Sequence, residues 1–438
     1  MDVDDPASGD RPWRLLCLSN GHGEDAIAVQ ILQALARRLD GPEVAVLPLV
    51  GEGDAYRRAG FSSLGPARQL PSGGFIYMDG GRQLWRDVRG GLVALTRSQL
   101  RTVRAWGEAA ARDPRPGAIL AVGDIVPLLF AAWSGVPYGF VGTAKSEYYL
   151  RDDDGQFLGM RRLEGWSGSV YLPWERWLLG RSRCRAIFPR DDLTAQVLAR
   201  CLGPRSRASS TTGGPVFNCG NPMMDGFEVP PTLPNPPGPG EPVEVLLLPG
   251  SRSPEAYGNW SRILAAVTAL LDQHRDRPWH VLAAPAPSLD LDHLADALRH
   301  HGWHCLEAGA PQSWQRDRAI LNLASDRFIP WAERCHLAIA TTGTATEQVV
   351  GLGKPALTLP GDGPQFTAAF AEAQTRLLGP PAIACDSPES LVNAVNDLLT
   401  DPDRWQTLAA IGRRRLGPPG AADRIAHILC QTFSGGLG

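Results

Sequence analysis

Short apolar runs alternate with longer stretches of helical periodicity along most of the chain. The runs are predicted to be strands and the longer stretches helices. Strands that alternate with helices indicate a parallel sheet with helices on both faces. In the first half, the pattern predicts strands over 14–19, 43–49, 118–122 and 138–142, and helices over 24–39 and 127–134.

A proline-rich segment interrupts this alternation near the middle of the chain. Residues 229–242 contain seven prolines among fourteen residues and almost no side chain that could pack in a core. This composition predicts a semi-rigid linker. After it the alternation restarts, with strands over 243–248, 279–284, 303–307, 337–340 and 355–359, and helices over 256–273, 291–301, 344–351, 365–377, 388–399, 402–415 and 421–434.

Two doubly wound α/β halves joined by a linker predict a GT-B arrangement, in which two Rossmann-like domains face each other across a cleft. Ligands then lie at the carboxyl ends of the strands of both sheets. We expect a disordered N-terminus over 1–12, a first Rossmann-like domain over 13–228, the linker over 229–242 and a second Rossmann-like domain over 243–415. The last segment, 416–438, is expected to pack its helix back on the first domain.

The composition limits the class of protein. A chain of 438 residues with 43% hydrophobic content can bury two ordinary cores. Its net charge of −3 argues against a general nucleic-acid binder, for which a basic domain is expected. The eight cysteines have neither the spacing of a zinc site nor that of a disulfide framework, which favours a reducing cytosol. The N-terminus has no apolar segment typical of a secretory signal, and Asp124 and two prolines interrupt the longest apolar stretch, 118–142, so we expect no membrane span.

Two predicted strands of the second half end in small or hydroxylated residues and lead directly into helices. Strand 243–248 is followed by Gly250, Ser251 and Arg252. Backbone N–H groups at helix N-termini bind phosphates, and an arginine adds a planar fork of donors. The alternative for this loop is a tight turn with a solvated arginine. The second loop, after strand 337–340, comprises Thr342, Gly343, Thr344, Ala345 and Thr346.

Small side chains in the second loop let the backbone approach a ligand, and Thr344 is expected to cap the helix. The two loops together predict a site for the diphosphate of a nucleotide sugar. No acidic metal-binding motif accompanies them, so we expect neither a metal ion nor another cofactor.

Five segments of the chain match the motifs of one family. In the second half they are LLPGSR (247–252) and TGTATEQVVGLGKPALTLP (342–360), and in the first half SNGHGEDAIAVQIL (19–32), ILAVGDIVPLLFAAWSGVP (119–137) and FNCGNPMMD (217–225). Together they resemble lipid-A-disaccharide synthase and its relatives over nearly the whole chain. The first loop departs from the family's Gly-Glu-x-Ser-Gly-Asp pattern and leaves the acceptor sugar open, because this chain has Gly21, His22, Gly23, Glu24 and Asp25 there.

The resemblance implies a glycosyltransferase of the hexosyltransferase class that uses a UDP-sugar, similar to UDP-GlcNAc, and a lipid or otherwise amphiphilic acceptor. The reaction would be inverting and metal-independent, with the donor on the second domain and the acceptor on the first. Glu347 would accept the ribose hydroxyls, although a carboxylate in a first helical turn also serves the helix dipole. Gln365 would lie near the donor sugar, although it is equally typical of a helix start.

The candidate catalytic residues are His22 and Asp124. His22 lies between two glycines after the first strand, and an imidazole with a pKa near ~6.5 can accept a proton from an attacking hydroxyl. Its alternative is local hydrogen bonding in a turn. Asp124 follows strand 118–122 and could be the base or orient His22, and its alternative is the N-cap of helix 127–134.

Other polar residues are assigned to the acceptor side, where Glu24 and Asp25 are also candidates for helix caps. Asn221 and Asp225 precede the linker and are expected to form a hinge wall. The chain has 41 arginines but only two lysines: Lys354 is expected to be exposed in a turn, and Lys145 to face the ligand. The acceptor-side set is Gly21, Gly23, Glu24, Lys145 and Asn221.

Two segments combine arginines with aromatic residues. Residues 68–104 hold seven arginines against two aspartates, and Arg97, Arg101 and Arg104 form one helical stripe. Residues 171–183 repeat this chemistry with two tryptophans. Such surfaces predict contact with anionic lipid headgroups, and the alternative is core-packed helices with solvated arginines.

Three functions remain open from the sequence. The first is the lipid-directed transferase, located in the cytoplasm and peripheral at the inner face of the membrane. The second is a UDP-sugar 2-epimerase of the same fold, which needs no lipid. The third is a non-catalytic nucleotide-sugar-binding protein. The sequence is compatible with a homodimer.

Overall fold

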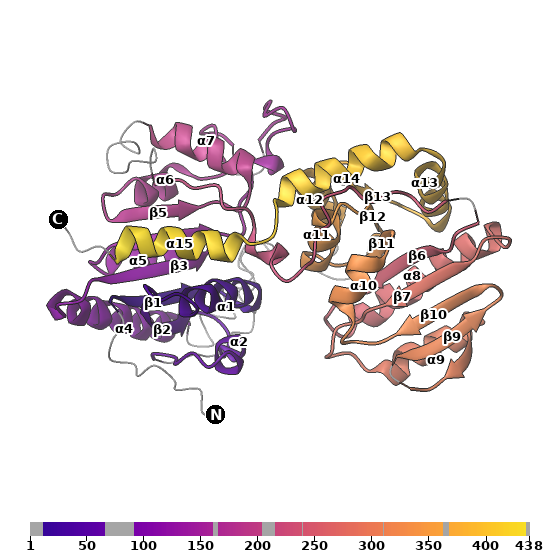
Figure 1. Ribbon diagram of the computed structural model, residues 1–438, viewed down its shortest axis with the longest axis horizontal. Coiled ribbons are helices and arrows are strands. Elements are labelled where there is room, and N and C mark those ends of the chain that lie inside the picture. The colour runs from indigo at the N-terminus through magenta and orange to yellow at the C-terminus, as the bar shows by residue number, and fades with distance from the viewer. Residues whose placement is uncertain are drawn as a thin grey trace. The chain divides into compact units, whose positions relative to one another are not determined.

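The computed structural model describes residues 12–65, 92–160, 165–203, 215–238, 240–309, 311–361 and 368–434. It divides the chain into two compact units, one formed by Met1–Asp225 with Gly420–Gly438 and the other by Gly226–Pro419 (Figure 1). Each unit is built on a mainly parallel sheet covered by helices, as the alternating sequence pattern predicts.

The first unit contains a five-stranded parallel sheet in the order β2-β1-β3-β4-β5. The strand order reverses between β1 and β3, because β2 lies on one side of β1 while β4 and β5 lie beyond β3. In open α/β sheets, ligands bind outside the carboxyl ends of the strands at such a switch point. The strands are β1 (Arg14–Ser19), β2 (Glu43–Pro48), β3 (Gly117–Gly123), β4 (Tyr138–Gly142) and β5 (Cys184–Phe188).

Helices cover both faces of this sheet, because alternate strand residues point to opposite sides. Leu15 and Cys17 pack with α1 (His22–Ala36) and α15 (Ala421–Phe433). Leu16 and Leu18 pack on the other face with α4 (Leu92–Arg112), α5 (Ile125–Trp133) and α6 (Pro173–Leu179). The unit also contains α2 (Asp54–Arg58), α7 (Asp192–Leu202) and the 3-10 turns η1 (Glu147–Tyr149) and η3 (Pro222–Met224).

The last helix, α15, completes the first unit. Asp225 caps its N-terminus, because the Asp225 carboxylate accepts hydrogen bonds from Ala421 N at 2.9 Å and Ala422 N at 2.6 Å. At the other end Phe433 stacks on Trp13, with ring centroids 6.0 Å apart. Figure 1 shows α15, in yellow, lying along the elements of the first unit.

The second unit contains an eight-stranded sheet in the order β13-β12-β11-β6-β7-β10-β9-β8. Six strands run parallel, and β9 and β8 add an antiparallel edge. The order reverses between β6 and β11, which makes this pair a second switch point. The strands are β6 (Val243–Leu248), β7 (Trp279–Ala283), β8 (His304–Glu307), β9 (Gln312–Arg316), β10 (Ala319–Leu323), β11 (Leu337–Ala340), β12 (Ala356–Thr358) and β13 (Ala382–Ala384).

The helices of the second unit pack against a core of strand residues and tryptophans, including Trp260, Trp279 and Trp405. These helices are α8 (Glu255–Gln273), α9 (Leu291–His300), α10 (Phe328–Arg334), α11 (Thr344–Gly351), α12 (Ala368–Leu378), α13 (Pro388–Thr400) and α14 (Pro402–Leu416). The sequence pattern predicts neither β9, β10 nor β13. β9 and β10 form a hairpin inside the sheet, between β7 and the edge strand β8. In β9 only Trp314 is buried and the other residues are polar, so the apolar signal is weak there.

The proline-rich segment is fixed to the second unit by side-chain donors. Arg277 Nη2 donates to the carbonyls of Pro237 and Gly238 at 3.0 and 2.9 Å. Arg413 Nη1 donates to Pro230 O at 2.8 Å. Proline has no N–H, so side chains rather than a backbone ladder satisfy these carbonyl oxygens.

Candidate functional site

In the second unit, the two predicted phosphate loops begin side by side at the switch point. β6 and β11 are neighbours in the sheet, and Thr341 N donates to Leu248 O at 2.9 Å where the two strands end. Gly250 and Gly343 follow within a few residues of this bond. The loops after β6 and β11 therefore emerge at the same edge of the sheet.

The first loop depends on a glycine and a buried amide. Gly250 has φ +110°, which side-chain-bearing residues rarely adopt. Asn259, on α8, is 5% exposed, and its Nδ2 donates to Pro249 O at 3.3 Å. Ser251 and Arg252 are exposed beyond this anchored turn. Their position suits contact with a ligand at the strand ends.

The second loop is held by internal hydrogen bonds and by a second buried amide. Thr346 is fully buried, and its Oγ1 donates to Thr342 O at 2.6 Å. Gln374, on α12, is 4% exposed, and its Nε2 donates to the carbonyls of Thr342 and Gly343 at 2.9 and 3.2 Å. These donors occupy the loop carbonyls and fix the loop. Glu347 N makes the first i→i−4 bond of α11, to Gly343 O at 3.1 Å, so the N–H groups of Thr344, Ala345 and Thr346 precede the helical ladder and suit a ligand.

The structure describes most of the residues predicted to bind the donor on α11. Gly343 occupies the N-cap position of α11 with no side-chain cap among the described residues, so the prediction that Thr344 caps the helix is wrong. Thr344 is instead the exposed first residue of the helix, with Ala345 next to it. Glu347 is half-buried in the first turn. Gln365 lies outside the described residues.

Sequence reasoning missed Asn259 and Gln374. Both lie on helices whose neighbouring positions are buried and apolar, such as Trp260 beside Asn259 and Leu377 near Gln374. A polar residue at a position where the helical period places apolar ones is the signal that could have found them.

In the first unit, three strand ends meet around Glu24. Thr143, directly after β4, donates from Oγ1 to Glu24 Oε1 at 3.4 Å. Gly123, at the end of β3, has φ +132°, and a Cβ there would lie 3.3 Å from Glu24 Cγ. Gly21, after β1, has φ +138°, and a Cβ there would lie 3.4 Å from Glu24 Oε2. The Glu24 side chain therefore occupies space that two glycines leave open at the switch point.

Burial raises the pKa of Glu24 to about 7, and the nearby Asp124 carboxylate adds to this rise. Burial also raises the pKa of Asp124 above its ordinary value. Asp124 is the N-cap of α5, since its Oδ1 accepts from Val126 N at 2.9 Å. The capping alternative for Asp124 is thus present in the structure.

The other residues of the first loop are His22, Gly23 and Asp25. His22 begins α1, but its side chain lies outside the described residues. Gly23 is exposed on the first turn. Asp25 is fully buried, and its Oδ1 accepts from Ser19 Oγ at 2.5 Å, a contact that the capping interpretation did not foresee.

Both lysines are engaged within the fold. Lys145 Nζ donates to Val170 O at 3.0 Å and pairs with Glu175 Oε2 at 2.7 Å. Lys354 is 6% exposed, so its predicted exposure is wrong. Its ammonium donates to the carbonyls of Ala332 and Glu333 at the end of α10, where the negative helix end favours a cation. Asn221, also assigned to the acceptor side, accepts from Met223 N at 3.2 Å as the N-cap of η3.

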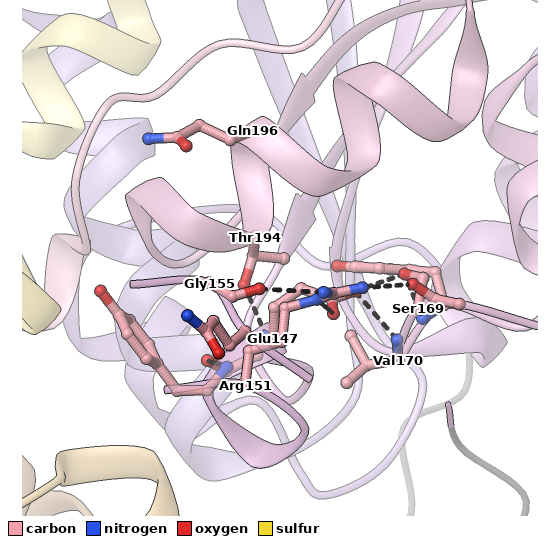
Figure 2. Close-up of polar contacts among 12 residues, drawn as sticks. Glu147, Arg151, Gly155, Ser169, Val170, Thr194 and Gln196 are labelled. Carbon is pink, nitrogen blue, oxygen red and sulfur yellow. Dashed lines mark hydrogen bonds and ion pairs between the residues drawn. The ribbon is translucent and has the colours of Figure 1, made fainter. Parts of the chain in front are cut away.

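The described residues between β4 and α6, 143–160 and 165–172, are held by a buried polar network (Figure 2). Glu147 is 0% exposed and accepts from Ser169 Oγ, from Val170 N at 2.9 Å and from Arg151 Nε at 3.1 Å. Arg151 also donates to the carbonyls of Gly155 and Gly168 at 3.0 and 2.9 Å. Thr194, on α7, accepts from Glu147 N at 2.9 Å and so ties the network to the helix layer.

Exposed apolar side chains lie on α6 and on the residues that the Glu147 network holds. Trp174 and Trp177 are 52% and 63% exposed on one face of α6, and Arg181 Cζ lies 4.7 Å from the centroid of the Trp177 ring. The described residues before α6 also include exposed apolar side chains: Phe157, Leu158, Met160 and Trp166.

The basic segment 68–104 is only partly described, because residues 66–91 lie outside the described part of the chain. Arg97, Arg101 and Arg104 are exposed on α4, as the helical stripe predicts. The apolar side of α4, including Val103 and Trp106, is packed in the core. Within the described residues, no helix is both long and apolar enough to span a membrane.

No protein-family model matches the chain, and no curated protein matches it in sequence. Solved structures do match it along nearly its whole length. A putative UDP-N-acetylglucosamine 2-epimerase from Listeria monocytogenes is similar with a TM-score of 0.54 at 15% identity, covering 96% of each chain. MurG from Acinetobacter baumannii has a TM-score of 0.54 at 13% identity, covering 96% of this chain and 100% of its own. The glycotransferase of kitacinnamycin has a TM-score of 0.51 at 15% identity, covering 97% of this chain and 100% of its own.

The chain has the GT-B fold. In this GT-B chain each sheet has one switch point, and each switch point carries the polar residues that the sequence singles out. Gly250–Arg252 and the loop around Gly343 lie at the β6/β11 point, and Glu24 and Asp124 lie at the β1/β3 point. At these identities the likeness concerns the fold.

Proposed function

We propose that the protein transfers a sugar, similar to GlcNAc, from a UDP-sugar to a lipid or other amphiphilic acceptor, as a relative of lipid-A-disaccharide synthase. The observation that carries the proposal is the pair of anchored loops at the β6/β11 switch point, whose carbonyls are occupied and whose helix N-terminal N–H groups are left for an anion. Structures of the same fold support the nucleotide, since they include an S. aureus MnaA–UDP complex and a Neisseria meningitidis UDP-GlcNAc 2-epimerase bound to UDP-GlcNAc.

In this proposal the second unit holds the donor. The first turn of α11 and the residues Gly250 to Arg252 bind the diphosphate, with Arg252 contributing charge-assisted hydrogen bonds. Glu347 accepts the ribose hydroxyls, and Gln365 contacts the donor sugar. Backbone N–H groups and a guanidinium then stabilise the negative charge that develops on the departing UDP, without a metal ion.

The first unit binds the acceptor and supplies the base. Its candidates lie at the β1/β3 switch point, where His22 and Asp124 follow β1 and β3. A base that removes the proton of the acceptor hydroxyl while that oxygen attacks the anomeric carbon gives inversion.

The amphiphilic acceptor is supported by the exposed tryptophans of α6. Indole rings favour the boundary between lipid and water, and arginines favour anionic headgroups. Residues 171–185 contain four arginines and one carboxylate, Glu175, which is buried against Lys145. We therefore propose that α6 contacts an anionic membrane at the cytoplasmic face.

The second candidate function is 2-epimerisation of a UDP-sugar, favoured by the solved structures that carry this activity in their names. One experiment separates the two functions and a non-catalytic binder. Purified protein is incubated with UDP-sugars, with and without a lipid extract, and the products are followed by NMR. UDP release that requires lipid supports transfer, a new epimer without lipid supports the epimerase, and binding without either product supports the non-catalytic protein.

A further inference from the structure

The β1/β3 switch point presents a carboxylate that the sequence assigns only a secondary role. We propose that Glu24 is the catalytic base, the group that accepts the proton of the acceptor hydroxyl. This role rests on the proposed transferase function and names one residue of its machinery.

The position of Glu24 is defined by three strands at once. Its carboxylate lies beside Gly21 after β1, its Cγ beside Gly123 at the end of β3, and its Oε1 accepts a hydrogen bond from Thr143 after β4. Either glycine would be strained by a side chain, because both have positive φ. The backbone is thus shaped around this side chain at the place where open α/β sheets bind ligands.

Asp124 is less suited to accept a proton, because it already has a structural role. Its Oδ1 caps α5 through Val126 N, and protonation would weaken this bond. Its charge acts on Glu24 instead, because a neighbouring carboxylate raises the pKa of Glu24.

The proton affinity of Glu24 fits the task. With its pKa raised to about 7 by burial, Glu24 is a stronger base than an ordinary glutamate and is still about half ionised at neutral pH. Thr143 is a positioning residue, since its hydrogen bond orients the carboxylate and lowers the pKa of Glu24.

The acceptor O–H bond breaks, and its proton moves to a Glu24 carboxylate oxygen. The acceptor oxygen forms a bond to the anomeric carbon while the bond from that carbon to the UDP oxygen breaks, and its electron pair leaves with UDP. Glu24 then returns the proton to water.

The test compares Glu24→Gln with wild type and with Glu108→Gln, which removes an exposed carboxylate from α4 of the same unit. UDP release with acceptor, UDP affinity and thermal melting are measured for each. We expect Glu24→Gln to lower kcat by about 10²–10⁴-fold with UDP affinity and folding retained, and Glu108→Gln to match wild type.

A pH profile separates a base from a structural residue. Wild-type kcat/KM should rise with pH through about 7, where Glu24 loses its proton. Thr143→Val should move this rise to higher pH, because it removes a hydrogen bond that lowers the pKa of Glu24. A folded Glu24→Gln variant with near wild-type turnover overturns the role of Glu24 alone. A wild-type protein that binds UDP-sugars but releases no UDP with any acceptor overturns the proposed function together with this role.

Discussion

The conformation of the loops at the β6/β11 switch point depends on neighbouring residues that lie outside the loops. Asn259 and Gln374 bind no proposed substrate group, yet their amide N–H groups occupy the loop carbonyls. A buried carbonyl without a donor costs about 1–3 kcal/mol, so these amides fix the loop conformation that leaves the helix N–H groups available. Residues outside both motifs therefore hold the loops of the proposed donor site in place.

Arg252 gives the most direct test of the donor site. Arg252→Ala should weaken UDP binding by about 1–3 kcal/mol, because a charge-assisted contact to the diphosphate is lost. Calorimetric titration of UDP measures this. Arg275→Ala, which removes an arginine with a 72% exposed side chain elsewhere in the second unit, is the control and should bind UDP as wild type does. Equal affinities for both variants would remove Arg252 from the donor site.

Asp124 caps α5, and its charge raises the pKa of Glu24. Two substitutions separate these two effects. Asp124→Ala should lower the free energy of unfolding by about 1 kcal/mol through loss of the cap, whereas Asp124→Ser, which can still cap α5, should restore most of it. Both remove the charge that raises the pKa of Glu24, so both should move the rise in kcat/KM to lower pH. Thermal melts and pH profiles of the two variants decide this, and a kcat loss of about 10²-fold or more in both, without a shift, would instead make Asp124 the base.

At the scale of elements, α6 has two opposite faces. Leu178 and Leu179 are buried in the core of the first unit, while Trp174 and Trp177 are exposed. The described residues before α6 are held by the Glu147–Arg151 network, which fixes Val170 close to the start of the helix.

Replacing Trp174 and Trp177 together by Ala should weaken binding to vesicles that contain phosphatidylglycerol by at least about tenfold, which corresponds to 1.4 kcal/mol. Co-sedimentation with vesicles measures it, with pure phosphatidylcholine vesicles as the uncharged comparison. Leu306→Ala, on the exposed strand β8 of the second unit, is the matched control. Equal sedimentation of the double variant and wild type would remove α6 from the membrane contact.

The sequence predicts elements best where burial is continuous. β11 is an uninterrupted apolar run, and β6 is broken only by Glu244. Both strands and the loops that follow them are found where the pattern predicts. β9 lies next to the edge strand β8, and Trp314 is its only buried residue, so its apolar periodicity is weak. Lys354 was misplaced because its partners, the carbonyls that end α10, come from another element and leave no local signal.

At the scale of the molecule, each unit repeats one arrangement: an open sheet, one reversal of strand order and polar residues at its carboxyl edge. The local alternation of strands and helices predicts this fold class. The contacts that shape the sites are formed across elements, such as Thr143 with Glu24 and Gln374 with Thr342, and could not be predicted because no local pattern encodes them.

The proposed transfer reaction should survive a chelator. In the proposed reaction, backbone N–H groups and Arg252 rather than a metal ion stabilise the departing UDP, so EDTA should leave the rate of UDP release unchanged. The rate is measured before and after dialysis against EDTA, with magnesium or manganese added back. Loss of activity that either ion restores would contradict a metal-independent reaction.

The two lysines have a consequence for chemical labelling. In a chain with 41 arginines, one lysine amine is ion-paired with Glu175 and the other is buried at the end of α10. Reagents that acylate lysine should therefore modify the folded protein slowly, and lysine-to-lysine cross-linkers should yield almost no distances. The arrangement of the two units in solution is better measured through carboxylate-directed cross-linking, and acylation at Lys354 would serve as a reporter that the second unit has opened.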